Sequence, residues 1–253
     1  MIAPLNEQNR AEYLRRCAAV PALGPLLAAN AAAFGLGGQL VQCYLCGAGV
    51  LQLRGANATL LGSTDGEELA DVLTFLGITA LRTQETVPLP PGWQCTGRAC
   101  VLEWQPVPGA ILPPLPQGVA LNEEPSVGAA LEILAGEGIA GLAAENLYSE
   151  LCAKRSRGLA CVWTAEADGA PVGCACASAI TDREAYLSEI ATLPAARGKG
   201  IGRALVAALA ARLAEGGRRV TLLCAPHRRS FYESFGFVQC GSFCELKPLP
   251  CGE

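Results

Sequence analysis

A glycine-rich turn between a strand pattern and a helix pattern constrains this sequence more than any other feature. Residues 186–193, YLSEIATL, have the pattern of a strand, and residues 202–215, GRALVAALAARLAE, have the pattern of an amphipathic helix. The turn between them contains Arg197, Gly200 and Gly202 in the spacing R-x-x-G-x-G. A helix that starts directly on glycines leaves backbone N–H groups of its first turn without side-chain partners. The turn therefore predicts an anion-binding site.

The composition of this turn suits a diphosphate. Its three glycines lack the Cβ atoms that would hold a diphosphate away from the backbone amides. They are Gly198, Gly200 and Gly202. Arg197, Lys199 and Arg203 add positive charge locally. Two other nucleotide-binding loops fit poorly, because GKGIGRA is neither G-x-G-x-x-G nor a phosphate-binding loop ending in G-K-[ST]. A glycine-rich turn that binds nothing remains the structural alternative.

The turn and the segments around it together resemble the GNAT N-acetyltransferase superfamily. The strand residues Ile190-Ala191-Thr192-Leu193-Pro194 precede the turn, and Phe231-Tyr232 and Gly236-Phe237 follow the helix and a further apolar strand, VTLLCA. The resemblance covers roughly the C-terminal half of the chain. It implies an α/β (α+β) fold with a mixed, mostly antiparallel central sheet flanked by helices, and it implies acetyl-CoA as the cofactor.

The resemblance also implies how acetyl-CoA is held. The pantetheine arm pairs like an added strand with the backbone of Ile190, Ala191 and Thr192. The diphosphate rests on the backbone of residues 197–203, with the arginine and lysine side chains as supplementary charge. These cofactor-binding candidates of the turn are Arg197, Gly198, Lys199, Gly200, Ile201, Gly202 and Arg203.

Tyr232 is the candidate for protonating the thiolate that leaves when the acetyl group is transferred. The segment FYESFGF matches the FY-x-x-x-GF pattern of the superfamily completely, and Phe231 and Phe235 are spaced to anchor a helix that carries the tyrosine. A half-buried tyrosine with a merely satisfied hydroxyl is the alternative. The superfamily often has an asparagine and an alanine ahead of this FY, whereas this chain has Ala225 and Arg228, so a side-chain contact to pantetheine is in doubt.

Glu189 is the candidate for taking a proton from the acceptor amine or for orienting a water that does so. It is the one acidic residue well placed on the strand before the turn. A strand carboxylate that faces solvent is the alternative. Glu145, Tyr148 and Glu150, on a predicted helix, are further candidates to border the acceptor site. Arg228 and Arg229 are candidates to reach the nucleotide phosphates, and exposed loop arginines are the alternative.

The resemblance predicts a cytoplasmic N-acetyltransferase that transfers the acetyl group of acetyl-CoA to a primary amine of a small molecule. A non-catalytic module that binds coenzyme A and senses or recruits a partner is the alternative, and protein acetylation is a third possibility. The net charge of −4 argues against a general nucleic-acid binder. The sequence names neither the acceptor nor the oligomeric state.

Thirteen cysteines are scattered along the chain, and several lie in apolar runs such as VGCACASAI. We interpret them as small buried hydrophobic residues in a reducing compartment. Cys43 and Cys46 form a C-x-x-C pair, with Cys95 and Cys100 further on, so a zinc site is an alternative. We expect no metal, because the second pair lacks tight spacing and His227 is the one histidine of the chain.

The length of 253 residues predicts two domains, and we place them at residues 1–113 and 114–253. A stretch rich in proline and glycine ends between residues 113 and 118 and marks the boundary. The N-terminal region has the order of half a GNAT domain without the R-x-x-G-x-G turn. We interpret it as a degenerate, cofactor-free copy of the fold, and an unrelated small α+β module remains the alternative.

Local patterns predict the other elements of both regions. Residues 9–33 predict one or two helices broken at Pro21 and Pro25, and this apolar run is too broken to cross a membrane. A hairpin with a third strand follows, and a helix with a serine N-cap comes before a short strand. In the second region a strand and two helices precede a hairpin that turns at Asp168-Gly169, and residues 237–249 predict a final strand or strand pair.

Overall fold

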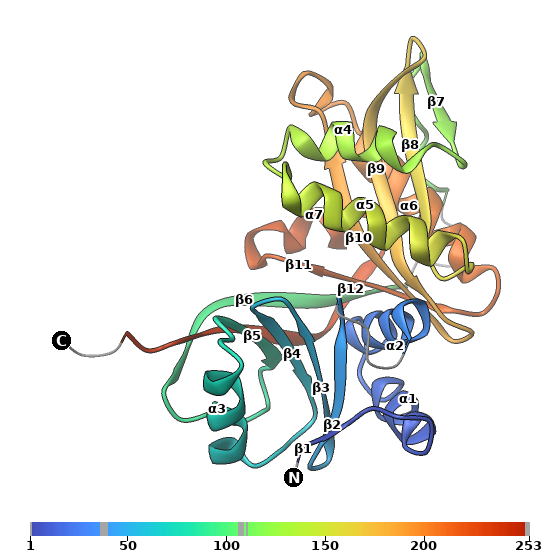
Figure 1. Ribbon diagram of the computed structural model, residues 1–253. Helices are drawn as coiled ribbons and strands as arrows, with labels where there is room; N and C mark the ends of the chain where they lie inside the picture. Colours follow the sequence, from blue (N-terminus) through green and yellow to red (C-terminus); the bar gives the residue numbers. More distant parts are fainter. Residues whose placement is uncertain (1, 36–39, 106–108, 110, 251–253) are drawn as a thin grey trace. The chain divides into compact units, whose positions relative to one another are not determined.

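The computed structural model describes residues 2–35, 40–105, 109 and 111–250, and it divides the chain into two compact units. The first unit contains Met1–Val101, Cys224–His227 and Cys240–Glu253, and the second contains Leu102–Leu223 and Arg228–Gln239. Both units combine a mostly antiparallel sheet with helices (Figure 1). The predicted α/β class with a mixed, mostly antiparallel sheet is therefore confirmed. The predicted boundary near residues 113–118 stays a prediction.

The first unit is built on the strand order β1-β2-β3-β4-β5-β12. Neighbouring strands are antiparallel except for the parallel pair of β4 and β5. The elements are β1 (Ile2–Pro4), α1 (Arg10–Cys17), α2 (Leu23–Phe34), β2 (Gln42–Cys46), β3 (Gly49–Arg54), β4 (Asn57–Leu61), α3 (Gly66–Phe75), β5 (Ala80–Gln84), the first part of β6 (Trp93–Trp104) and the last part of β12 (Phe237–Pro248). Leu51, Leu60, Leu69 and Leu246 belong to one apolar core between α3 and the sheet.

Several details of the first unit differ from the sequence predictions. Pro25 does not break a helix, because it is the third residue of α2, where proline removes no intrahelical hydrogen bond. The break falls at Pro21, as predicted, and Ala22 has a positive φ of 67°. The N-cap of α3 is Asp65 and not a serine, since its carboxylate accepts a hydrogen bond from Glu68 N at 3.0 Å.

The second unit is built on the strand order β11-β10-β9-β8-β7. Strands β7 to β10 are antiparallel to their neighbours, and β11 is parallel to β10. The elements are β7 (Val119–Asn122), α4 (Val127–Ala135), α5 (Leu142–Arg155), β8 (Cys161–Ala167), β9 (Ala170–Ile180), β10 (Glu184–Thr192), α6 (Ile201–Ala214), β11 (Arg219–Cys224), α7 (Arg229–Glu233) and the first part of β12. Asp168 and Gly169 both have positive φ, so the predicted hairpin turn between β8 and β9 is confirmed.

Helices cover the sheet of the second unit on both faces (Figure 1). One face packs α4 and α5 over a core that includes Val127, Ile133, Leu151 and Cys176. The short side chains of β9, such as Ala175, alternate with the cysteines and leave room for α6. A turn that includes the short 3-10 helix η1 (Pro194–Ala196) connects the end of β10 to the start of α6.

The twelve cysteines of the described residues form no disulfide, and most are buried. Burial raises the pKa of Cys17 and that of Cys174 to about 12. Within the described ranges, no group of three or more histidine, cysteine, aspartate or glutamate side chains is arranged to hold a metal ion. None of the helices in those ranges has the length and apolar character that crossing a bilayer requires.

Candidate functional site

The strand β10 carries a bulge in the second half of its length. Its register with β9 shifts between Ser188 and Ala191, and Glu189 adopts a positive φ of 50° inside the shift. Positive φ is uncommon for residues other than glycine, and bulges re-aim the side chains around them. The half-buried Glu189 is thereby turned out of the regular alternation of the strand, and its carbonyl accepts a hydrogen bond from Cys174 Sγ at 3.4 Å.

The two parallel strands of the second unit are in register over only part of β10. Their pairing runs from Glu184 with Arg219 to Leu187 with Leu222, and β10 continues to Thr192. In the described residues, Ile190–Thr192 therefore have no register partner on the β11 side. An unpaired strand edge presents backbone N–H and C=O groups to which an extended ligand can pair. The predicted pantetheine residues lie on such an edge.

The helix α6 begins on Gly200, which has a positive φ of 83° and makes no side-chain cap hydrogen bond. Gly198 also has a positive φ, of 76°, so both glycines suit the backbone of this turn. A Cβ on Gly202 would lie 3.1 Å from Thr192 Oγ1, so the helix approaches the end of β10 closely. The first turn therefore offers backbone N–H groups that the Gly200 position does not cap and that no side chain of the described residues is seen to occupy. This cradle fits a diphosphate.

The positively charged side chains of the turn are engaged to different degrees. The Arg197 guanidinium donates from Nε to Thr192 O at 3.0 Å and forms an ion pair with Glu137, which follows α4. Arg203 donates from Nη2 to Ser234 O at 2.9 Å. Lys199 is exposed and makes no hydrogen bond or ion pair with any residue that the structure describes. Of the three, only Arg197 has a carboxylate partner among the described residues, and Lys199 is the one that makes no such contact at all.

Tyr232 is buried within an aromatic cluster, with 6% of its surface exposed. Its ring centroid lies 5.0 Å from that of Phe231, 6.0 Å from that of Phe235 and 5.9 Å from that of Phe237. Trp104 completes the cluster at 5.1 Å from Phe237. Phe231 and Phe235 were predictable from their spacing, whereas Trp104 was not, since no local pattern connects it to α7. The assigned proton-donor role of Tyr232 stays a prediction.

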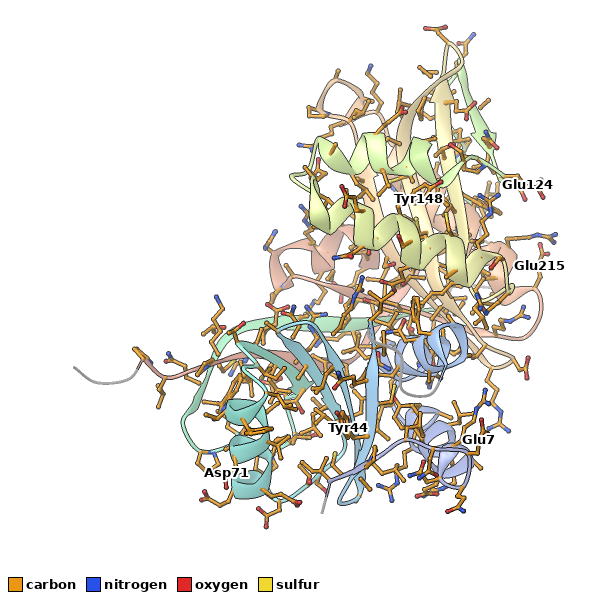
Figure 2. All side chains as sticks on the ribbon, viewed as in Figure 1. Glu7, Tyr44, Asp71, Glu124, Tyr148 and Glu215 are labelled. Carbon is orange, nitrogen blue, oxygen red and sulfur yellow. The ribbon has the colours of Figure 1, made fainter. Side chains whose placement is uncertain are left out.

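The other candidates of the second unit lie in different surroundings. Arg229 donates to Gln239 Oε1 at 2.8 Å and pairs with Glu233, so its charge is already matched. Tyr148 projects from α5 with 48% of its surface exposed (Figure 2). Glu150 is buried and accepts from Lys154 Nζ at 2.6 Å. Lys154 was not predicted as the partner of Glu150, although the i, i+4 spacing of this pair is visible in the sequence.

Comparison with known proteins agrees with this geometry. Residues 158–239 match the model of the acetyltransferase (GNAT) domain, and no curated protein matches the sequence. A solved GCN5-related N-acetyltransferase from Kribbella flavida is similar at 18% identity and a TM-score of 0.61, over 83% of this chain and 90% of its own. A GCN5-related N-acetyltransferase from Sphaerobacter thermophilus is similar at 13% identity and a TM-score of 0.66, over 100% of this chain and 96% of its own.

A third solved structure, a tandem GNAT protein from the clavulanic acid biosynthesis pathway, matches 100% of this chain and 99% of its own, at 15% identity and a TM-score of 0.63. At these identities the likenesses show the fold alone, and the last two of them extend along the whole chain. The family model adds the sequence pattern of the C-terminal half, which includes the R-x-x-G-x-G turn and α7. The predicted recognition is therefore confirmed for the C-terminal half of the chain: residues 158–239 carry a GNAT acetyltransferase domain.

Proposed function

We propose that this protein is an N-acetyltransferase that transfers the acetyl group of acetyl-CoA to a primary amine of a small molecule in the cytoplasm. The observation that carries the proposal is the start of α6 on Gly200, without a side-chain cap, after the edge of β10. One end of an extended, diphosphate-bearing ligand would rest on the first turn of α6, and its other end would follow β10.

Different residues of the second unit would bind different parts of this ligand. The backbone of Ile190, Ala191 and Thr192 would pair with the pantetheine arm. The backbone amides of residues 201–203 would hold the diphosphate, and Lys199 would add a charge that no protein group neutralises. Arg197 would act mainly on the turn itself, because its guanidinium is held by Thr192 O and Glu137.

The chemistry needs a proton removed from the amine and a proton supplied to the departing thiolate. Acetyl-CoA would supply the activated acetyl group as its thioester. We assign the supply of the second proton to the Tyr232 hydroxyl, which lies on α7 in the same unit as the start of α6. We assign the first task to Glu189, directly or through a water, because the bulge turns this residue out of the regular strand.

A thiol-release assay tests the proposal. Purified protein is incubated with acetyl-CoA and a panel of small amines and lysine-bearing peptides, and free thiol is measured alongside calorimetric binding of coenzyme A. We expect release that depends on a small amine. Binding without release for any amine would support the non-catalytic alternative, and preference for peptides would support protein acetylation. Absence of coenzyme A binding would overturn all three.

Tyr232→Phe tests the catalytic assignment separately. We expect kcat to fall by about 10²-fold or more while the Kd of acetyl-CoA stays unchanged, because a general acid acts only in the chemical step. Tyr44→Phe removes a hydroxyl from β2 of the first unit and is the matched control, for which we expect wild-type kinetics. An unchanged rate for the Tyr232 variant with every accepted amine would remove the assigned role.

A further inference from the structure

The Arg203 side chain connects the start of α6 to the end of α7. Arg203 is the third residue of α6, and its Nη2 donates to Ser234 O at 2.9 Å. Its Cζ atom also lies 5.7 Å from the ring centroid of Phe235. A single guanidinium thus holds the residue that caps α7 and the aromatic ring that follows it. From the sequence, we assigned the same side chain to the phosphates of the cofactor.

This contact suits the end of a short helix. The last carbonyl groups of a helix have no intrahelical donors, and a cation placed there also interacts favourably with the helix dipole. Ser234 reinforces the same end, since its Oγ donates to Phe231 O at 2.6 Å. The helix α7 has five residues, which is too short for stability on its own. Its position therefore depends on contacts such as the one from Arg203.

The Tyr232 ring lies directly against the residue that Arg203 covers. The centroids of Tyr232 and Phe235 are 6.0 Å apart, and Phe235 packs in turn on Phe237 at 5.7 Å. The Arg203 guanidinium lies over the Phe235 ring and donates a hydrogen bond to the carbonyl of the preceding residue, Ser234. A displacement of the guanidinium would therefore release both the end of α7 and one wall of the Tyr232 environment.

We infer that Arg203 is a positioning residue, which holds α7 against the first turn of α6 and so fixes the Tyr232 hydroxyl relative to the bound thioester. The inference rests on the proposed function, in which Tyr232 protonates the leaving thiolate. In this role the guanidinium serves α7, while the backbone N–H of Arg203 remains part of the diphosphate cradle. Catalysis is sensitive to such placement, because an error of about 1 Å can reduce a rate about 100-fold.

A truncated donor separates positioning from phosphate binding. Acetyl-pantetheine carries the thioester but has no diphosphate, so a phosphate ligand cannot affect its use. We expect Arg203→Met to reduce kcat/KM by about tenfold or more, and by the same factor, with acetyl-CoA and with acetyl-pantetheine. A loss confined to acetyl-CoA would overturn the inference and return Arg203 to the phosphates.

Two matched variants calibrate this comparison. Lys199→Met removes an exposed charge of the turn, and we expect it to raise KM for acetyl-CoA alone. Arg212→Met removes an arginine that pairs with Glu215 further along α6, and we expect wild-type values with both donors. Circular dichroism and thermal unfolding establish that Arg203→Met is folded, and Arg203→Lys, which keeps a donor for Ser234 O, should recover part of the activity.

The double variant Arg203→Met, Tyr232→Phe supplies a readout that a general loss of stability would not give. We expect it to be as slow as Tyr232→Phe alone, because a misplaced hydroxyl and an absent one have the same effect. Multiplicative losses would contradict the inference. If the wild-type protein acetylates no amine with either donor, the proposed function is overturned. If the wild-type protein is active and Arg203→Met has the same kcat/KM, only the inference about Arg203 is overturned.

Discussion

At the scale of single residues, Lys154 has the most demanding environment of the second unit. Its side chain is fully buried, and Nζ donates to Glu150 Oε1 at 2.6 Å and to Ser178 O at 2.9 Å. A buried ammonium is tolerated only when it is paired and hydrogen-bonded. The pair joins α5 to β9 on the face of the sheet opposite α6.

We expect Lys154→Met to destabilise the protein by about 3–5 kcal/mol, because it leaves the Glu150 carboxylate buried without its cation. The double variant Lys154→Met, Glu150→Gln should recover a large part of this loss, since it removes the uncompensated charge. Lys247→Met, at an exposed position of β12, is the control for loss of a lysine. Urea unfolding measures all three, and equal stability of the single and double variants would contradict the argument.

The site residues that could be predicted from the sequence are those whose identity is set by the local backbone conformation. Gly198 and Gly200 have the positive φ that their spacing before a helix suggested. The partners of the charged side chains were not predictable, because they come from distant segments. Arg197 pairs with Glu137, and Arg203 reaches Ser234. Opposite charges occur throughout the sequence, so only the fold selects which of them meet.

At the scale of elements, α3 of the first unit and α6 of the second unit differ in how their first turns are capped. Each of these helices follows a strand that has a parallel neighbour: α3 follows β4, and α6 follows β10. In the first unit the Asp65 carboxylate caps α3 and Glu67 and Glu68 occupy its first turn, while Gly62 N donates to Gln84 Oε1 at 2.8 Å. The carboxylates supply negative charge, and the side chains of Asp65 and Gln84 accept hydrogen bonds from backbone N–H groups. In the second unit Gly200 leaves the first turn of α6 uncapped by any side chain.

We therefore expect calorimetry to give one molecule of coenzyme A per chain. Gly200→Asp would place a carboxylate at the start of α6, and aspartate is among the residues that best tolerate positive φ. The variant should lose all detectable binding, because the new carboxylate lies beside the N–H groups of the first turn and repels the diphosphate from them.

Asp65→Ala is the matched control for this experiment. It removes the carboxylate cap of α3 and should leave both the stoichiometry and the affinity for coenzyme A unchanged. Binding of two molecules by the wild-type protein, or binding retained by Gly200→Asp, would show that the first unit holds coenzyme A.

Whether each longer element is a helix or a strand could be predicted, because the spacing of its apolar residues depends on the local sequence alone. The strands β2, β3 and β4 and the helix α6 follow alternating and amphipathic patterns that the sequence displays. The details that failed depend on neighbours. Asp65 and not a serine caps α3, and β6 runs without a break from Trp93 through Gly97 to Trp104, because pairing sustains a strand through residues with weak propensity.

At the scale of the whole molecule, the chain is not divided into two continuous segments. The first unit includes Cys240–Glu253, and Phe243–Leu246 of β12 pair antiparallel with Leu81–Gln84 of β5. Leu246 is fully buried in the core of this unit, together with Leu73 and Leu81. The pairing of β12 with β5 could not be predicted from the sequence, because the composition of a segment does not reveal a strand partner about 160 residues away.

A substitution near the C-terminus should therefore destabilise the N-terminal region. We expect Leu246→Ala to lower the free energy of unfolding by about 2–5 kcal/mol, the usual range for truncating a leucine in a core. Lys247→Ala, at the exposed neighbouring position, should lower it little.

Hydrogen exchange measured by mass spectrometry locates the effect of Leu246→Ala in the chain. Peptides from β3, β4, β5 and α3 should lose protection in Leu246→Ala, whereas peptides from β8 and β9 should keep theirs, because Leu246 contributes to the core of the first unit. Loss of protection centred on β8 and β9 would contradict the assignment of this strand to the first unit.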